Sequence, residues 1–138
     1  MKVSVMSRSE ALARVWQPGD FLVSITSAEE GSTHFSGTVD VVQLAFADDD
    51  SSMHSDHARA ILGYANRCHQ AGGRLFVHCG AGISRSAGVA EALHRLGIAE
   101  WDERDDEVWS PVGLMPRYQP NAHVVSMVLR AAAPVDES

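Results

Sequence analysis

The fold of this chain is decided by the stretch Leu75-Phe76-Val77-His78-Cys79-Gly80-Ala81-Gly82-Ile83-Ser84-Arg85-Ser86. An apolar run without alternation enters this stretch, as in a strand buried on both faces. An alanine-rich run that favours a helix follows it, over residues 87–93. A strand, a tight glycine-containing loop and a helix N-terminus in this order are typical of an anion-binding site, because the first amides of a helix have no partner within it.

The remaining sequence predicts an α/β fold. Apolar runs indicate strands over 2–6, 21–25, 39–46 and 74–77, and caps with helical spacing indicate helices over 10–16, from Ser55 or Asp56 to Gly72, over 86–96 and over 121–133. This order predicts a central, largely parallel sheet of four to five strands with helices on both faces. Residues 99–110, with tryptophans eight apart, indicate an exposed helix or an irregular lobe. Residues 111–120 indicate a loop, with Pro120 suited to the first turn of the last helix.

Length and composition bound the class of protein. The 138 residues, 45% hydrophobic and 21% charged, fit one domain spanning 1–138. We find no leader peptide and no apolar run long enough to cross a membrane, and there are two cysteines. We therefore expect a cytoplasmic monomer that does not bind membranes. The net charge of −7 disfavours nucleic-acid binding through a broad basic face.

The loop has the residue types that phosphate-ester cleavage by a thiol requires. The nucleophile must be a thiolate, whereas a free thiol has a pKa of about 8.5. A helix N-terminus and the fixed positive charge of Arg85 both favour the thiolate form of Cys79. Gly80 and Gly82 permit backbone conformations that turn amides toward a bound phosphate. The predicted phosphate-binding residues are therefore Gly80, Ala81, Gly82, Ile83, Ser84 and Arg85, whose planar fork matches two phosphoryl oxygens.

Further groups would complete the chemistry. Ser86 can hydrogen-bond the sulfur of Cys79 and ease its departure, and His78 either fixes the loop by hydrogen bonds or is an ordinary core histidine. The leaving oxygen needs a proton, which a carboxylic acid on a facing loop would supply. A loop with three aspartates, over 48–50, follows the strand predicted at 39–46, and sites in parallel sheets gather where the strands end.

The loop resembles the signature of the cysteine-dependent protein tyrosine phosphatase superfamily, in the pattern His78-Cys79-x-x-Gly82-x-x-Arg85-Ser86. The string from 81 to 86 is similar to the dual-specificity branch, as is Pro120-Asn121 before the last helix. The resemblance covers about 39–129 and implies phosphomonoester hydrolysis through a phosphocysteine, without a metal or other cofactor. The family's acid lies roughly thirty residues before the cysteine. Asp48, Asp49 and Asp50 precede Cys79 by 31, 30 and 29 residues. We assign Asp48 as general acid, with Asp49 in reserve, because Asp48 lies two residues after Phe46 at the end of the predicted strand.

The loop carries no lysine, unlike the loops of relatives that act on phosphoinositides. With the acidic composition, this favours a phosphoprotein or a small phosphoester as substrate over lipids or RNA 5′-phosphates. Two alternatives stay open. One is a non-catalytic module that reads phosphorylated residues with the same anion cradle. The other is arsenate reduction, which is disfavoured because its cysteine–arginine loop lies near the N-terminus in the families that perform it.

Two other features of the sequence are candidate sites. His54 and His57 stand three apart near a helix start, but no third metal ligand has a telling spacing. Cys68 falls on the apolar face of the helix before the central strand, where it is either a core residue or a resolving thiol for oxidised Cys79.

Overall fold

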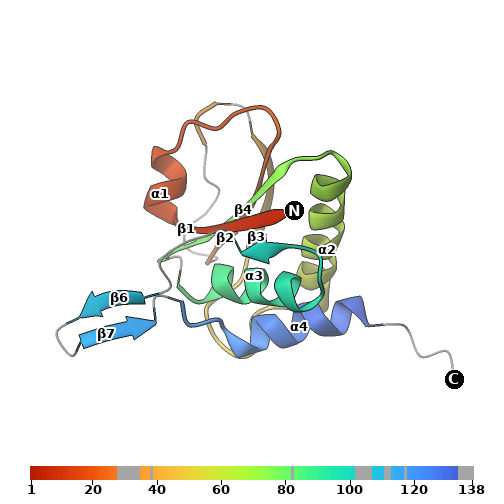
Figure 1. The fold of residues 1–138 in the computed structure, drawn as a ribbon. Coiled ribbons are helices and arrows are strands. Elements are labelled where there is room, and N and C mark those ends of the chain that lie inside the picture. Colours follow the sequence, from red (N-terminus) through yellow and green to blue (C-terminus); the bar gives the residue numbers. More distant parts are fainter. Residues whose placement is uncertain are drawn as a thin grey trace, which may run out of the picture.

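A computed structural model describes residues 1–27, 35–37, 39–81, 83–101, 107–110, 113–116 and 118–133 (Figure 1). For 107–110 and 113–116 the structure describes the backbone alone. The elements, in chain order, are β1 (Lys2–Ser7), α1 (Arg8–Ala13), β2 (Asp20–Thr26), β3 (Asp40–Ala45), α2 (Ser55–Gln70), β4 (Arg74–Cys79), α3 (Arg85–Arg95), β5 (Glu100–Trp101), β6 (Glu107–Ser110), β7 (Gly113–Pro116) and α4 (Ala122–Ala132).

The central sheet is parallel throughout its five strands, in the order β3-β2-β4-β1-β5. Strand β4 is in the middle, paired with β2 on one side and β1 on the other. The predicted α/β fold with a parallel sheet is therefore confirmed. Because β4 is central and ends at Cys79, the loop that follows it emerges between the ends of two neighbouring strands.

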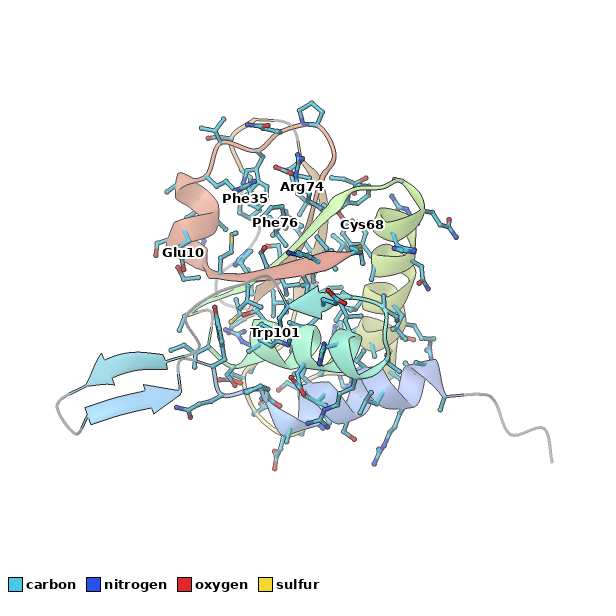
Figure 2. All side chains as sticks on the ribbon, in the orientation of Figure 1. Glu10, Phe35, Cys68, Arg74, Phe76 and Trp101 are labelled. Carbon is cyan, nitrogen blue, oxygen red and sulfur yellow. The ribbon has the colours of Figure 1, made fainter. Side chains whose placement is uncertain are left out.

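Helices cover both faces of the sheet, but unequally (Figure 1). On one face α1 encloses a small cluster formed by Met6, Ala11, Trp16, Leu22 and Phe76. The opposite face carries the main core, to which α2, α3 and α4 contribute. Figure 2 shows Phe76 and Phe35 on the α1 side of the strands and Trp101 on the other side. Since side chains alternate along a strand, neighbouring residues of β4 serve different faces, and Cys79 belongs to the main core.

Capping residues set the starts of two helices, α1 and α4, that contact the loop after β4. Ser7 and Glu10 form a reciprocal capping box that begins α1 directly after β1. Asn121 caps α4, its side-chain oxygen accepting a hydrogen bond from the Val124 amide at 3.1 Å. The prediction that Pro120 lies in the first turn is wrong, because the cap at Asn121 places Pro120 before the helix.

The segment between α3 and α4 is where the sequence prediction fails most clearly. Among the described residues the helix expected over 99–110 is absent, because Glu100–Trp101 and Glu107–Ser110 are strands, and Gly113–Pro116 is a strand within the expected loop over 111–120. The alternative of an irregular lobe stays a prediction, because 102–106 lie outside the described residues. Strand β5 pairs with β1 at the sheet edge, and β6 and β7 form an antiparallel hairpin that projects from the body in Figure 1. The tryptophan spacing suggested a helical face, but Glu107–Ser110 pairs as an extended strand with Gly113–Pro116, a contact that spacing within one segment does not reveal. In the described part of the chain, no helix is long and apolar enough to cross a membrane.

Candidate active site

Cys79 is the last residue of β4, and its thiol is almost enclosed, with the residue 2% exposed. Its Sγ lies 3.1 Å from the Oγ of Ser86, a fully buried residue in the first turn of α3. The predicted contact between Ser86 and the sulfur is thus present. A hydroxyl at this distance can donate a hydrogen bond to a thiolate, which stabilises the charged form of the sulfur.

Carbonyl groups of the loop between Cys79 and α3 bond to the surrounding scaffold. The Gly80 carbonyl accepts from the Arg8 amide, the Ile83 carbonyl from the Gln119 amide, and the Ser84 carbonyl from the Asn121 amide, all at 2.9–3.0 Å. In a trans peptide the carbonyl and the following N–H point in opposite directions. The amides of Ala81, Ser84 and Arg85 therefore point away from the scaffold, and these three residues all line one pocket.

The Arg85 guanidinium is held by groups outside the loop. Arg85 is 7% exposed, and its Nη1 donates to the Phe46 carbonyl at 2.8 Å and to Ser27 Oγ at 3.3 Å. Phe46 directly follows β3 and Ser27 directly follows β2; β2 pairs with β4, and β3 pairs with the other edge of β2. The guanidinium is thus fixed at one nitrogen, which leaves the rest of its fork for an anion.

The parts predicted for the two loop glycines stay predictions. Gly80 has no left-handed φ, and a Cβ there would lie 3.4 Å from the Arg85 Nη2, an ordinary contact distance. Gly82 lies outside the described residues, so its predicted part in the phosphate-binding loop stays a prediction.

His78 is fully buried on the α1 side of the sheet and links two strands to the loop. Its Nδ1 donates to the Cys79 carbonyl at 3.2 Å, and in the neutral ring its Nε2 accepts from Ser24 Oγ at 2.6 Å. The Phe35 ring packs edge-on against it, at 5.6 Å between centroids. Both interpretations of His78 therefore apply. It is a buried core histidine with hydrogen bonds at both ring nitrogens, and one of these bonds fixes the Cys79 carbonyl.

The two candidate acids have different surroundings. Asp48 lines the pocket with Cys79, and its Oδ1 accepts from Ser84 Oγ at 2.7 Å and from Asn121 Nδ2 at 2.8 Å. Asp49 bonds within its own turn, accepting from the Ser52 hydroxyl and from the Ser51 and Ser52 amides. These hydrogen bonds, with that of the Ser52 hydroxyl the strongest, lower the pKa of Asp49 to about 2. Asp49 is therefore a poor proton donor near neutral pH.

The pocket that these groups form has a volume of about 360 Å³ and is lined by Asp48, Cys79, Ala81, Ile83, Ser84, Arg85 and Gln119. Ile83 stands at its rim, 40% exposed. The sequence prediction missed Gln119, Asn121, Ser27 and the Phe46 carbonyl. Of these, only Asn121 had a local signal, as a capping residue before an apolar helix. The arrangement can bind an oxyanion and bring a thiol and a carboxyl group to it.

The structure does not support the other two candidate sites, the histidine pair His54 and His57 and the thiol of Cys68. The His57 Nδ1 accepts from the His54 amide at 2.9 Å and the rings stack, and no group of three metal-ligating side chains occurs among the residues with described positions. Cys68 is fully buried, and burial raises the pKa of its thiol to about 11.

Cys68 is also at the wrong end of the central strand to act as a resolving thiol. Its carbonyl accepts from the Gly73 amide just before β4 begins, and Figure 2 shows Cys68 at that end of α2. Cys79 ends β4, five residues after Arg74, which at a rise of about 3.3 Å per residue puts it about 16 Å farther on. A disulfide needs Cα atoms within about 7 Å, so the structure argues against this role.

Comparisons with known proteins support the fold. No family model matches the sequence, and a search of curated proteins finds no significant match. Among solved structures, the human tyrosine phosphatase-like serine/threonine/tyrosine-interacting protein is similar, with a TM-score of 0.54 and 20% sequence identity over 80% of this chain and 74% of that one. This chain has a phosphatase-like fold. The resemblance of the loop signature to the dual-specificity branch therefore has support at the level of the fold.

Proposed function

We propose that this protein is a phosphomonoester hydrolase of the protein tyrosine and dual-specificity phosphatase type, which acts through a phosphocysteine intermediate. The observation that carries the proposal is that Cys79, Arg85 and Asp48 line the same pocket, at the end of the central strand. A thiol, a fixed guanidinium and a carboxyl group are the three groups that metal-independent phosphoryl transfer to sulfur requires.

In the first step the Cys79 thiolate attacks phosphorus, and the phosphorus–oxygen ester bond breaks. The leaving oxygen takes a proton from the Asp48 carboxyl group, so that it departs as an alcohol or phenol. The Arg85 guanidinium and the loop amides hold the other phosphoryl oxygens. Charge on these oxygens is then stabilised by groups that are already oriented.

In the second step water attacks phosphorus and transfers a proton to the Asp48 carboxylate, and the phosphorus–sulfur bond breaks. Inorganic phosphate and the Cys79 thiolate are released, which restores the starting state. The Ser86 hydroxyl, 3.1 Å from Sγ, donates to the sulfur as negative charge returns to it. Departure of the thiolate is thereby made easier.

The pocket also bears on the class of substrate. Arg85 is its one cationic lining residue among those described, and Ala81, Ile83 and Gln119 form uncharged walls. Such a pocket suits a single phosphoryl group on a protein side chain or on a small organic ester. It offers little to a ligand with several phosphates, because no second described cation lines it.

Hydrolysis of p-nitrophenyl phosphate between pH 5 and 8 tests the proposal. We expect the wild type to turn over, Cys79→Ser to lose turnover and still bind vanadate or phosphate, and Cys68→Ala to keep turnover as the matched control. A folded wild type that binds phosphate without hydrolysing any ester would overturn the proposal. It would favour the non-catalytic reader of phosphorylated residues, to which the description of the similar human protein as an interacting protein also draws attention.

A further inference from the structure

The Asp48 carboxyl group is held by donors from two different elements. Ser84, at the start of α3, donates its hydroxyl to Oδ1 at 2.7 Å, and Asn121, at the start of α4, donates its side-chain amide to the same oxygen at 2.8 Å. The three residues form a closed set, because the Asn121 backbone amide also donates to the Ser84 carbonyl at 3.0 Å. We name this set, Asp48, Ser84 and Asn121, the acid clamp.

Capping of its own helix does not by itself account for the side-chain orientation of either donor. Ser84 occupies the N-cap position of α3, yet its side chain makes no capping hydrogen bond and is directed to Asp48 instead. Asn121 does cap α4 with its Oδ1, which leaves its Nδ2 to donate both to Asp48 and to the Asp49 carbonyl at 3.0 Å. The amide of Asn121 therefore connects the acid loop to α4 in addition to capping the helix.

The distribution of donors over the two carboxyl oxygens has a chemical consequence. Both donors contact Oδ1, and among the described residues none donates a hydrogen bond to Oδ2. An oxygen that accepts two hydrogen bonds is a poor place for a proton, so the proton of the neutral acid resides on Oδ2. The clamp can then persist in both protonation states, because Oδ1 is an acceptor in each.

We propose that Asn121 is a positioning residue for the general acid, and that with Ser84 it presents Oδ2 of Asp48 to the leaving oxygen. This inference rests on the proposed phosphatase function and adds to it a residue from the last helix. A mispositioning of about 1 Å costs about 10²-fold in rate, and in kcat/KM, which reports the steps up to departure of the leaving group, it acts on proton donation by the acid. Loss of the clamp should therefore matter most for esters whose leaving groups need that proton.

The test uses aryl phosphates that range from p-nitrophenyl phosphate to phenyl phosphate, with kcat/KM measured at pH 6. Asn121→Ser keeps a capping oxygen for α4 but lacks the amide donors, and Asn121→Ala loses both functions. We expect kcat/KM of Asn121→Ser for p-nitrophenyl phosphate to stay within about threefold of the wild-type value. Its kcat/KM for phenyl phosphate should be at least about tenfold lower than that of wild type, which is the same dependence on the leaving group that Asp48→Asn should show. Ser126→Ala, on α4 but lining the groove against α3, serves as the matched control.

The outcomes separate this inference from the proposed function. An Asn121→Ser variant that tracks the wild type across the series, or that loses the same factor on every ester, overturns the positioning role while leaving the phosphatase proposal intact. An impaired Asn121→Ala variant beside a normal Asn121→Ser variant shows that only the helix cap matters, which also overturns it. A wild type without turnover on any ester removes both proposals together.

Discussion

Replacing Asp48 and Asp49 by asparagine, one at a time, should separate a proton donor from a residue that shapes its loop. Asp49 has a pKa of about 2, so at pH 6 only about one molecule in 10⁴ carries a proton there. Asp48→Asn removes the proposed donor, and we expect kcat/KM for phenyl phosphate to fall about 10²–10⁴-fold. The fall with p-nitrophenyl phosphate should be smaller, since its phenolate leaves with less need of a proton.

Asp49→Asn is the matched control because asparagine can keep the turn. Its Oδ1 can accept from the Ser51 and Ser52 amides, which contact the same atom of Asp49 at 3.0 and 2.6 Å. The Ser52 hydroxyl can reverse and accept from the new amide nitrogen. We therefore expect Asp49→Asn to retain kcat/KM within about tenfold on every ester.

Steady-state kinetics across the ester series at pH 6 gives the measurement, with circular dichroism to establish that both variants are folded. The reasoning fails if Asp49→Asn shows the larger loss on phenyl phosphate, or if Asp48→Asn loses the same factor on every ester. The first result would move the acid role to Asp49, and the second would show that Asp48 acts on binding or on loop shape rather than on proton transfer.

Two further predictions concern the scaffold. Burial alone would raise the pKa of Asp20, but hydrogen bonds from the Gln17 amide and from Arg74, with nearby guanidinium charge, hold it below its ordinary value. Ionised Asp20 therefore stabilises the folded protein above about pH 4, and this stabilisation is lost as the pH falls through the lowered pKa. Asp20→Asn should reduce the Tm at pH 7 and make the Tm fall less steeply between pH 7 and pH 3. Equal declines of the Tm in both proteins would contradict this. A Cβ in Gly88→Ala would stand 3.0 Å from the Asn121 carbonyl, so this change should displace the start of α4 and lower the Tm by several degrees. It should also slow the hydrolysis of phenyl phosphate more than that of p-nitrophenyl phosphate. Unchanged kinetics would show that α4 accommodates the methyl group.

The sequence predicts the parallel sheet well because its strands are marked locally. The runs at 21–25 and 74–77 are apolar without alternation, and both form strands in the middle of the sheet. The hairpin of β6 and β7 could not be predicted in the same way. Its strands are four residues each, and their pairing depends on contacts between segments rather than on a period within one.

In the site, too, the residues of one local motif could be predicted, whereas groups from separate segments could not. Cys79, Ser86 and Arg85 lie within eight residues of sequence, so one motif reveals them together. The groups that orient them come from elsewhere, and one of them is the backbone carbonyl of Phe46, which any residue could supply. Spacing also could not choose between adjacent aspartates, whereas the hydrogen bonds of the Asp49 turn do distinguish them.

The acid clamp also bears on the order in which the protein is made. Synthesis proceeds from the N-terminus, so Asp48 and the loop that ends in Arg85 leave the ribosome before Asn121 does. Until α4 follows, a nascent chain holds its nucleophile while its acid lacks the second donor, and the parts of α2 and α3 that pack against α4 remain uncovered. The same late helix thus closes the hydrophobic core and, on the proposed function, orients the acid, so a chain still in synthesis would hold the proposed nucleophile before its general acid is in place.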